Sequence, residues 1–214
     1  MHKLTRPDGP SCLTSYRHGA NTWRDVTQAQ KTEIWLKLDE MQNKRCAYCE
    51  CAIKTSLSDS NSHIEHFRQR ARYPQGTFLW SNLFGSCNNS DRCGTHKDNL
   101  PLYIPEDVIK PDEEDPEDFL LFLDDGSVIA RQNLNVVDTQ RAEETIRIFN
   151  LDSPLRQIRE THVKGYKQTA EELAEMAANF DEEDWRPSLE EELAKIADLP
   201  FSTAIKHILL AGWE

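Results

Sequence analysis

Apolar side chains along this chain follow a helical period near the N-terminus and form short paired runs further on. Between Thr27 and Asn43, the residues Trp35, Leu38 and Met41 fall on one face of a helix. Two apolar runs, at 119–123 and 127–130, flank an Asp-Gly pair, which is the pattern of a β-hairpin. The pattern therefore predicts a helix over 27–43 and a hairpin over 119–130.

The last third of the chain is predicted to be helical. Ser153 followed by Pro154 is typical of a helix start, with serine as the N-cap and proline at the first helical position. This signal predicts one long helix reaching about Ala178, and two shorter helices after Pro187 and Ser202. The longest apolar run has five residues, far below the ~20 that cross a bilayer, so we expect no membrane span.

The middle of the chain predicts a small ββα unit. Strands are expected at 63–68 and 82–86, and a helix from Gly94 onward. The expected fold class is α+β and mostly helical, a ββα core with helical N- and C-terminal extensions. Residues 1–104 would form the core module with its N-terminal helix. Residues 105–214 would form an acidic, mostly helical region packed against it as one integrated unit.

Four cysteines in this middle region suit a structural metal. Zn²⁺ takes four thiolate or imidazole ligands in a tetrahedron, and a two-residue spacer lets both sulfurs of a pair reach one ion. A disulfide scaffold is the alternative, since six cysteines form an even set. The first seven residues lack a secretion signal, and thiols in a reducing cytosol more often bind metals. We therefore predict a cytoplasmic protein with structural zinc and with spare thiols at Cys12 and Cys51. The zinc ligands would be Cys46, Cys49, Cys87 and Cys93.

The polar residues among these cysteines suit phosphodiester hydrolysis, which needs a base for water and a cation for the leaving oxygen. Glu65 offers a hard oxygen ligand for Mg²⁺ or Mn²⁺, and His96 offers an imidazole for the same catalytic ion. His66, with an ordinary pKa near 6.5, suits the base. Because alternate residues of a strand share a face, His63 would lie beside Glu65 as a further ligand or a supporting group.

Each of these residues also has an ordinary structural interpretation. A histidine on a half-buried strand is more often structural than catalytic, and Asn82 is also a common turn residue. Isolated motif residues have high false-positive rates. A catalytic interpretation is favoured because the cysteines, the acid, the histidines and the asparagine occur in order within about fifty residues.

The motifs resemble the HNH endonuclease superfamily and, within it, the PtuB-type nucleases of Septu and some retron-associated anti-phage systems. The segments that carry the resemblance are 46–50, 63–71, 80–83 and 93–97, and the segments 110–119 and 142–151 also resemble that family. The resemblance implies that Glu65 and His96 bind the catalytic ion, that His66 is the base and that Asn82 orients the catalytic loop. Many superfamily members place the last ligand directly after the final cysteine, where this chain has Gly94.

Charge is divided unevenly along the chain. Residues 1–100 hold 14 Lys and Arg against 10 Asp and Glu, a net charge of +4, whereas residues 101–214 hold 11 against 27, a net charge of −16. Arg68, Arg70 and Lys97, near the expected base, are predicted to contact substrate phosphates. The acidic half would repel nucleic acid and instead suits docking to a basic partner.

The resemblance implies that this partner is a PtuA-like ATPase of the ABC/SMC class, in some systems with a retron reverse transcriptase and its DNA and RNA. The chain has no Gly-x-x-x-x-Gly-Lys-Ser/Thr loop of its own. The sequence thus predicts a metal-dependent HNH endonuclease that serves as the effector subunit of a defence complex. Two alternatives stay open: a non-catalytic zinc-stapled adaptor, and a nuclease that cuts RNA such as tRNA in place of DNA.

Overall fold

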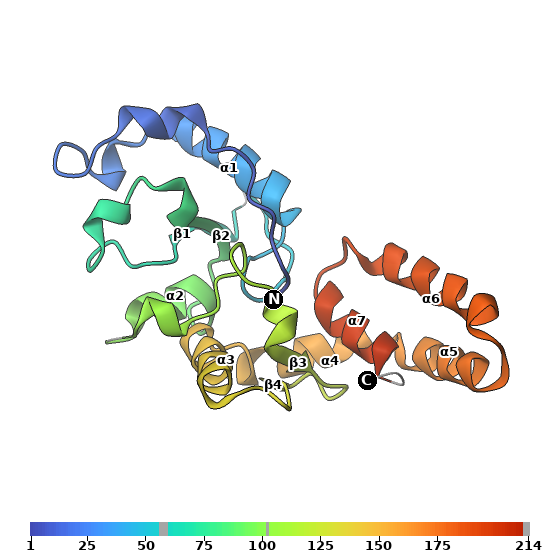
Figure 1. The fold of residues 1–214 in the computed structure, drawn as a ribbon. Coiled ribbons are helices and arrows are strands. Elements are labelled where there is room, and N and C mark those ends of the chain that lie inside the picture. Colours follow the sequence, from blue (N-terminus) through green and yellow to red (C-terminus); the bar gives the residue numbers. More distant parts are fainter. Residues whose placement is uncertain (56–59, 102, 212–214) are drawn as a thin grey trace.

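A computed structural model describes residues 1–55, 60–101 and 103–211. Two small antiparallel sheets are surrounded by helices, and a helical arm projects from one side (Figure 1). In chain order the elements are α1 (Gln28–Gln42), β1 (Ser62–His66), β2 (Leu83–Cys87), α2 (Cys93–Asn99), β3 (Leu120–Phe122), β4 (Val128–Ala130), α3 (Val136–Phe149), α4 (Arg156–Lys164), α5 (Lys167–Asn179), α6 (Glu182–Ile196) and α7 (Ser202–Leu210).

Helix α1 forms where the sequence predicts it. The side chain of Thr27 accepts a hydrogen bond from the backbone N–H of Gln30, and the Gln30 side chain returns to the backbone of Thr27, which is a capping box. The helix ends at Asn43 in the left-handed conformation, which asparagine tolerates well. Its inner face buries Ile34 and Leu38. The predicted helix over 27–43 is confirmed.

Strands β1 and β2 pair antiparallel, and α2 follows them to complete the ββα unit. Glu65 lies opposite Phe84 and His66 opposite Leu83. Every residue of β2 is buried, because α1 covers one face of the strand and α2 the other. The predicted small sheet and its helix are confirmed within one residue or two of the expected bounds.

A buried glutamine ties α1 to this sheet. The side-chain amide of Gln42 donates to the carbonyls of Arg45 (2.7 Å) and Gly85 (2.9 Å), and its oxygen accepts from the N–H of Gly85 (2.7 Å). These bonds satisfy the edge of β2 that faces away from β1. Gln42 therefore substitutes for a third strand at this position.

The second sheet is the predicted hairpin. β3 and β4 pair antiparallel, and the turn contains Gly126 at φ +78°, a conformation that favours glycine. Helix α7 packs on β3, where the Nδ1 of His207 accepts a hydrogen bond from the N–H of Phe122 (3.0 Å).

The prediction of one long helix over 153–178 is wrong. A 3₁₀ turn at Ser153–Leu155 leads into α4, and the chain bends at Gly165 and Tyr166 before α5 begins. Glycine is a poor helix former, so this position breaks the helix easily. The bend lets α5 pack against both α6 and α7, and these helices form the arm at the right of Figure 1.

The expected start of the next helix at Pro187 is also wrong. Helix α6 begins five residues earlier, with Glu182, Glu183 and Asp184 in its first turn. Acidic side chains there complement the positive end of the helix dipole, and the proline is accommodated inside the helix at the loss of one backbone hydrogen bond. The last helix, α7, begins at Ser202 as predicted.

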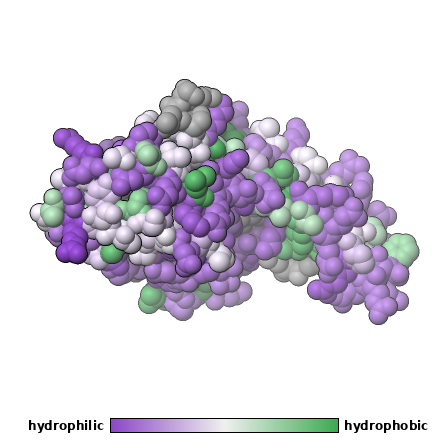
Figure 2. All heavy atoms as spheres, turned by 90° about the horizontal axis from the view of Figure 1, so that it is seen from above, coloured by the Kyte–Doolittle hydropathy of each residue, from purple (hydrophilic) through white to green (hydrophobic). Residues whose placement is uncertain are grey.

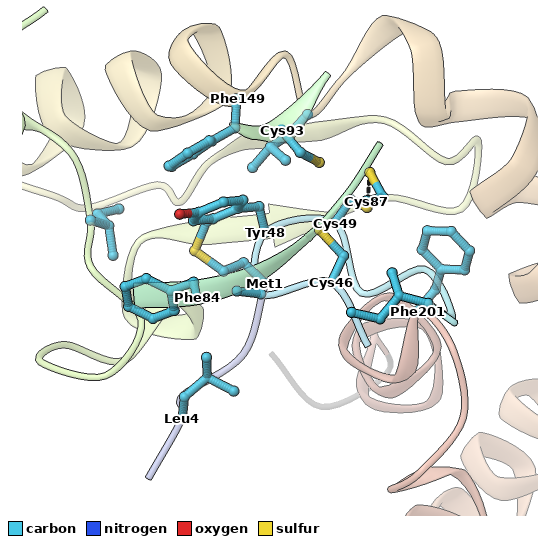
Figure 3. Close-up of a cluster of buried hydrophobic side chains, with 14 of the residues drawn as sticks. Met1, Leu4, Cys46, Tyr48, Cys49, Phe84, Cys87, Cys93, Phe149 and Phe201 are labelled. Carbon is cyan, nitrogen blue, oxygen red and sulfur yellow. Dashed lines mark hydrogen bonds between the residues drawn. The ribbon is translucent and has the colours of Figure 1, made fainter. Parts of the chain in front are cut away.

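Residues from both predicted halves build one hydrophobic core. Tyr48 stacks on Phe149 of α3, with ring centroids 3.9 Å apart and planes inclined by 16° (Figure 3). The N–H of Leu4 donates to the carbonyl of Pro111 (2.8 Å). The outer face seen in Figure 2 is largely hydrophilic, including the arm. No helix of the described residues is long and apolar enough to cross a membrane.

Replacing Gln42 tests whether this side chain holds α1 to the sheet. We expect Gln42→Leu to lower the free energy of unfolding by about 2–4 kcal/mol, because buried backbone groups of Gly85 and Arg45 lose their partners. The measurement is urea denaturation of zinc-loaded protein. Gln28→Leu, at an exposed position of the same helix, is the control and should change stability little. Equal stability of the two variants would contradict this role.

Candidate functional site

Four sulfur atoms converge at the junction of three segments. Cys46 and Cys49 come from the loop after α1, Cys87 ends β2 and Cys93 begins α2 (Figure 3). All four are buried, and their sulfurs lie within 4.8 Å of one another. Zn–S bonds of about 2.3 Å in a tetrahedron place sulfurs roughly 3.8 Å apart, so the cluster fits Zn²⁺. Four buried cysteines close together could thus bind the predicted ion.

The thiol of Cys51 and the guanidinium of Arg92 lie near the four-cysteine cluster. The sulfur of Cys51 lies 3.3 Å from that of Cys49, so this thiol is a close neighbour of the cluster, whereas Cys12 packs against α1. Burial opposes a charge on Arg92, but the nearby thiolates of Cys49 and Cys87 outweigh it and raise the pKa of the guanidinium. A zinc ion held by four thiolates here would carry a net charge of −2, and Arg92 would offset one unit of it.

The carboxylate of Glu65 is buried between two basic side chains on the α2 side of β1. Its Oε1 lies 2.8 Å from the ammonium of Lys97, and its Oε2 lies 3.3 Å from Nε2 of His63. Burial raises the pKa of Glu65, but the positive charge of Lys97 and the contact with His63 outweigh it and hold the pKa below its ordinary value.

Gly94 is what allows α2 to approach this carboxylate. A Cβ added at Gly94 would lie 2.5 Å from Oε2 of Glu65. Gly94, which directly follows Cys93, therefore faces Glu65 and offers no ligand side chain.

Lys97 is an internal partner of Glu65 and does not reach the surface. Its side chain is fully buried, and its ammonium also contacts the carboxylate of Asp98 (2.6 Å) and donates to the carbonyl of His66 (3.0 Å). Burial lowers the pKa of Lys97, but the charge of Glu65 reverses the effect and raises it. The expectation that Lys97 contacts substrate phosphate disagrees with this position, since no phosphate can approach a fully buried ammonium.

His66 is the last residue of β1 and points to the opposite side of the strand. Its Nε2 lies 3.0 Å from the backbone carbonyl of Thr77. A carbonyl only accepts, so the neutral ring carries its proton on Nε2 and leaves Nδ1 as the basic nitrogen. Trp23 packs edge-on against the ring, with centroids 4.6 Å apart. Burial, with the positive charge of Arg70, lowers the pKa of His66 to about 4, so the ring is neutral at pH 7.

Asn82 fixes the loop that follows His66. Its Oδ1 accepts from the N–H of Arg68 (2.8 Å), and its Nδ2 donates to the carbonyls of Arg68 and Gly76 (both 3.1 Å). The side chain is buried at the entrance to β2. Asn82 therefore holds the two ends of the 67–76 loop together.

The two candidate histidine ligands lie in different places. Nδ1 of His96 is 3.0 Å from the carbonyl of Ile148 in α3, whereas His63 contacts Glu65 directly and also Asn88 (2.8 Å). Burial lowers the pKa of His63, but the hydrogen bond and charge of Glu65 reverse this and raise it. Two neighbouring ligands of an ion with bonds of about 2.1 Å lie roughly 3 Å apart, so the His63–Glu65 separation fits a shared cation.

Arg68 and Arg70 are both predicted to contact substrate phosphates, but they differ in their ion-pair partners. Arg68 pairs with Glu106 (2.8 Å) and lies over the ring of Tyr73. Arg70 is exposed, lies 6.0 Å from the ring centroid of Trp23, and has no ion-pair partner among the described residues. Arg70 is therefore the more available cation beside His66.

Sequence reasoning did not find Trp23 or Asp98. Trp23 lies some forty residues before the motif and touches His66 only through the tertiary fold, so no local pattern marks it. Asp98 follows Lys97 directly and shares its ammonium with Glu65. The signal that could have identified Asp98 is its position in the sequence, directly after Lys97 of the motif.

Comparison with known proteins shows a similarity over most of the chain. No protein-family model matches it. The chain is 27% identical over 193 residues to the Septu protein PtuB from Bacillus thuringiensis, a match that covers 85% of this chain and 67% of that protein. The chain is therefore similar to PtuB over most of its length. The resemblance to PtuB-type proteins is thereby confirmed, and the ββα unit is consistent with the wider HNH superfamily.

The zinc ligands can be tested by elemental analysis. We expect about one tightly held Zn²⁺ per chain, and Cys49→Ser should lose the metal and unfold or aggregate, because the binding energy of a structural zinc is folding energy. Cys12→Ser, which alters a buried thiol outside the cluster, should keep both metal and melting temperature. The assignment of these four cysteines as structural zinc ligands would be contradicted by a metal-free preparation that melts cooperatively at the temperature of the zinc-loaded protein.

Proposed function

We propose that this chain is a metal-dependent HNH endonuclease, the nuclease subunit of an anti-phage defence complex. Homology to a Septu protein supports the defence role. The observation that carries the chemical part is His66, whose Nε2 is held by the Thr77 carbonyl so that Nδ1 is the basic nitrogen, next in sequence to the buried Glu65. This is the pairing of base and metal ligand that phosphodiester hydrolysis needs.

In this proposal each residue of the site has one task. His66 takes a proton from a water molecule as that water forms a bond to phosphorus and the bond to the 3′ oxygen breaks. Asn82 keeps the loop after His66 in place, and Lys97 keeps Glu65 ionised. A Mg²⁺ or Mn²⁺ ion held at Glu65 would stabilise the negative charge on the phosphate and the departing oxygen.

The second protein ligand of this ion is proposed to be His63. The resemblance implies His96, but its ring is engaged with the Ile148 carbonyl on α3. His63 contacts Glu65, and its side chain is 32% exposed, so this edge of the site can be reached from solvent. His96 would then hold α2 against α3.

The acidic C-terminal half supports a partner-dependent nuclease. Its net charge of −16 disfavours phosphate, and much of that charge lies on the α5–α6 arm. A PtuA-like ATPase of the ABC/SMC class with a basic surface suits this arm, and in some systems a retron reverse transcriptase with its DNA or RNA would join the complex. Such a complex would act in the bacterial cytoplasm.

Two other functions deserve a direct comparison. A non-catalytic zinc-stapled adaptor would need the fold but not the basic nitrogen of His66. A nuclease for RNA such as tRNA would use the same residues, because the site engages the phosphate backbone. Incubation of the complex with labelled plasmid and with total RNA distinguishes a nuclease that cuts DNA from one that cuts RNA.

Replacing the proposed base separates catalysis from folding. We expect His66→Ala to lower the cleavage rate of the complex by about 10²–10⁴-fold, the usual contribution of a general base, while zinc content and assembly with the partner stay unchanged. The rate is measured in single-turnover reactions on labelled substrate. His18→Ala, an exposed histidine far from the motif, should cleave normally. Unchanged activity of His66→Ala would favour the adaptor or another base.

The two histidines near α2 form a matched pair for the metal assignment. We expect His63→Ala to raise the Mg²⁺ or Mn²⁺ concentration for half-maximal cleavage by about tenfold or more, because one ligand is lost. His96→Ala should leave this concentration nearly unchanged. The titration is made at saturating substrate with the zinc retained. A larger shift in His96→Ala than in His63→Ala would restore the original assignment.

A further inference from the structure

A groove of about 390 Å³ lies along β1, on the edge that has no strand partner within the described residues. Helix α1 and the 3₁₀ turn Trp23–Asp25 form one side, and the loop after β1 forms the other. His63 belongs both to this groove and to the pair with Glu65. The groove therefore opens directly beside the proposed catalytic residues. Its main lining side chains are Trp23, Lys31, Trp35, His63, Ile64 and Arg70.

Two half-buried tryptophans give the groove aromatic surfaces. The ring of Trp23 is held between His66 (4.6 Å between centroids) and Phe78 (6.3 Å). Trp35 lies close against β2, where a Cβ added at Gly85 would be 2.7 Å from its Cζ3 atom. Both indoles are thus fixed in place, and rigid aromatic rings in a groove are platforms on which nucleobases stack.

The groove also carries two cations without ion-pair partners in the described part of the chain. Lys31 on α1 and Arg70 after β1 lie on its walls. By contrast, Lys37 on the same helix pairs with Glu40 (2.8 Å). Positive side chains left unneutralised in an otherwise acidic protein suit contacts to backbone phosphates.

We infer that this groove binds single-stranded nucleic acid, with a base stacked on Trp35 and flanking phosphates at Lys31 and Arg70. The link to cleavage rests on the function proposed above, which the inference extends by naming the substrate class as a strand with unpaired bases beside the cut. A base inside a duplex has both faces covered by its neighbours, so duplex DNA cannot use the tryptophan surface without unstacking.

Fluorescence anisotropy with labelled oligonucleotides tests the inference. The zinc-loaded full chain is titrated at low ionic strength, without Mg²⁺ or Mn²⁺, against a 12-nucleotide strand (about the site size of one binding groove) and the same sequence as a duplex. We expect the strand to bind at least about tenfold more tightly than the duplex. Trp35→Leu should weaken strand binding by about 5- to 100-fold, the range for loss of one stacked base.

Lys31→Gln should weaken binding and reduce the slope of log Kd against log salt concentration by about one phosphate contact. The controls are Lys37→Gln on the same helix and Phe180→Leu, an exposed aromatic on the arm, and both should bind like the unchanged chain. A strand of abasic sites should bind weakly and lose its dependence on Trp35.

The outcomes separate this inference from the proposed nuclease activity. The groove assignment is overturned if the duplex binds as tightly as the single strand or more tightly. It is also overturned if folded Trp35→Leu and Lys31→Gln bind like the unchanged chain, or if no oligonucleotide binds at all. If Trp35→Leu does not fold, Lys31→Gln decides, because the Lys31 side chain has no ion pair with the residues that the structure describes. A third outcome is that the single strand binds in a way that depends on Trp35 and Lys31, but the assembled complex cleaves no nucleic acid. This outcome would support the groove as a binding site and contradict the proposed nuclease activity.

Discussion

The convergence of four cysteines is the constraint on which the proposed site depends. The sulfurs come from the loop after α1, the end of β2 and the start of α2. Cys87 lies opposite Ser62 in the sheet, so fixing Cys87 also fixes the register of β1, including Glu65 and His66. Cys93 sets the first turn of α2 and therefore the approach of Gly94 and Lys97 to Glu65. One bound zinc would thus position both faces of the strand that carries the acid and the base.

The second constraint is electrostatic. Glu65 is almost fully buried, and a buried carboxylate is costly unless positive groups or hydrogen bonds surround it. Lys97 supplies the permanent charge from the protein interior, and His63 supplies the contact at the exposed edge. Oε2 of Glu65 lies 3.3 Å from Nε2 of His63, whose side chain is 32% exposed. Glu65 is thus kept ionised by Lys97 from the protein interior, while solvent reaches the pair through His63.

Local signals in the sequence predicted much of the fold and part of the site. The capping box at Thr27, the Asp-Gly hairpin and the cysteine spacing each act over a few residues, so they could be read directly. The role of Lys97 could not, because lysine is normally exposed and its burial depends on α2 packing against β1. His96 was expected at the metal, but Gly94 and Lys97, three residues apart, share the inner face of α2 and turn His96 towards α3. The bend at Gly165 was missed because a lone glycine is tolerated inside many helices.

The claim that the four-cysteine centre holds strand β1 in place is tested most directly by hydrogen–deuterium exchange, with and without zinc. The account predicts that removing zinc exposes the amides of β1 and β2 to rapid exchange, since their register depends on Cys87 and Cys93. The β3–β4 hairpin and the α5–α6 arm, which lie outside the centre, should keep more of their protection. Unchanged protection of β1 and β2 in zinc-free protein would contradict the account, because the strand carrying Glu65 and His66 would then be positioned without the metal.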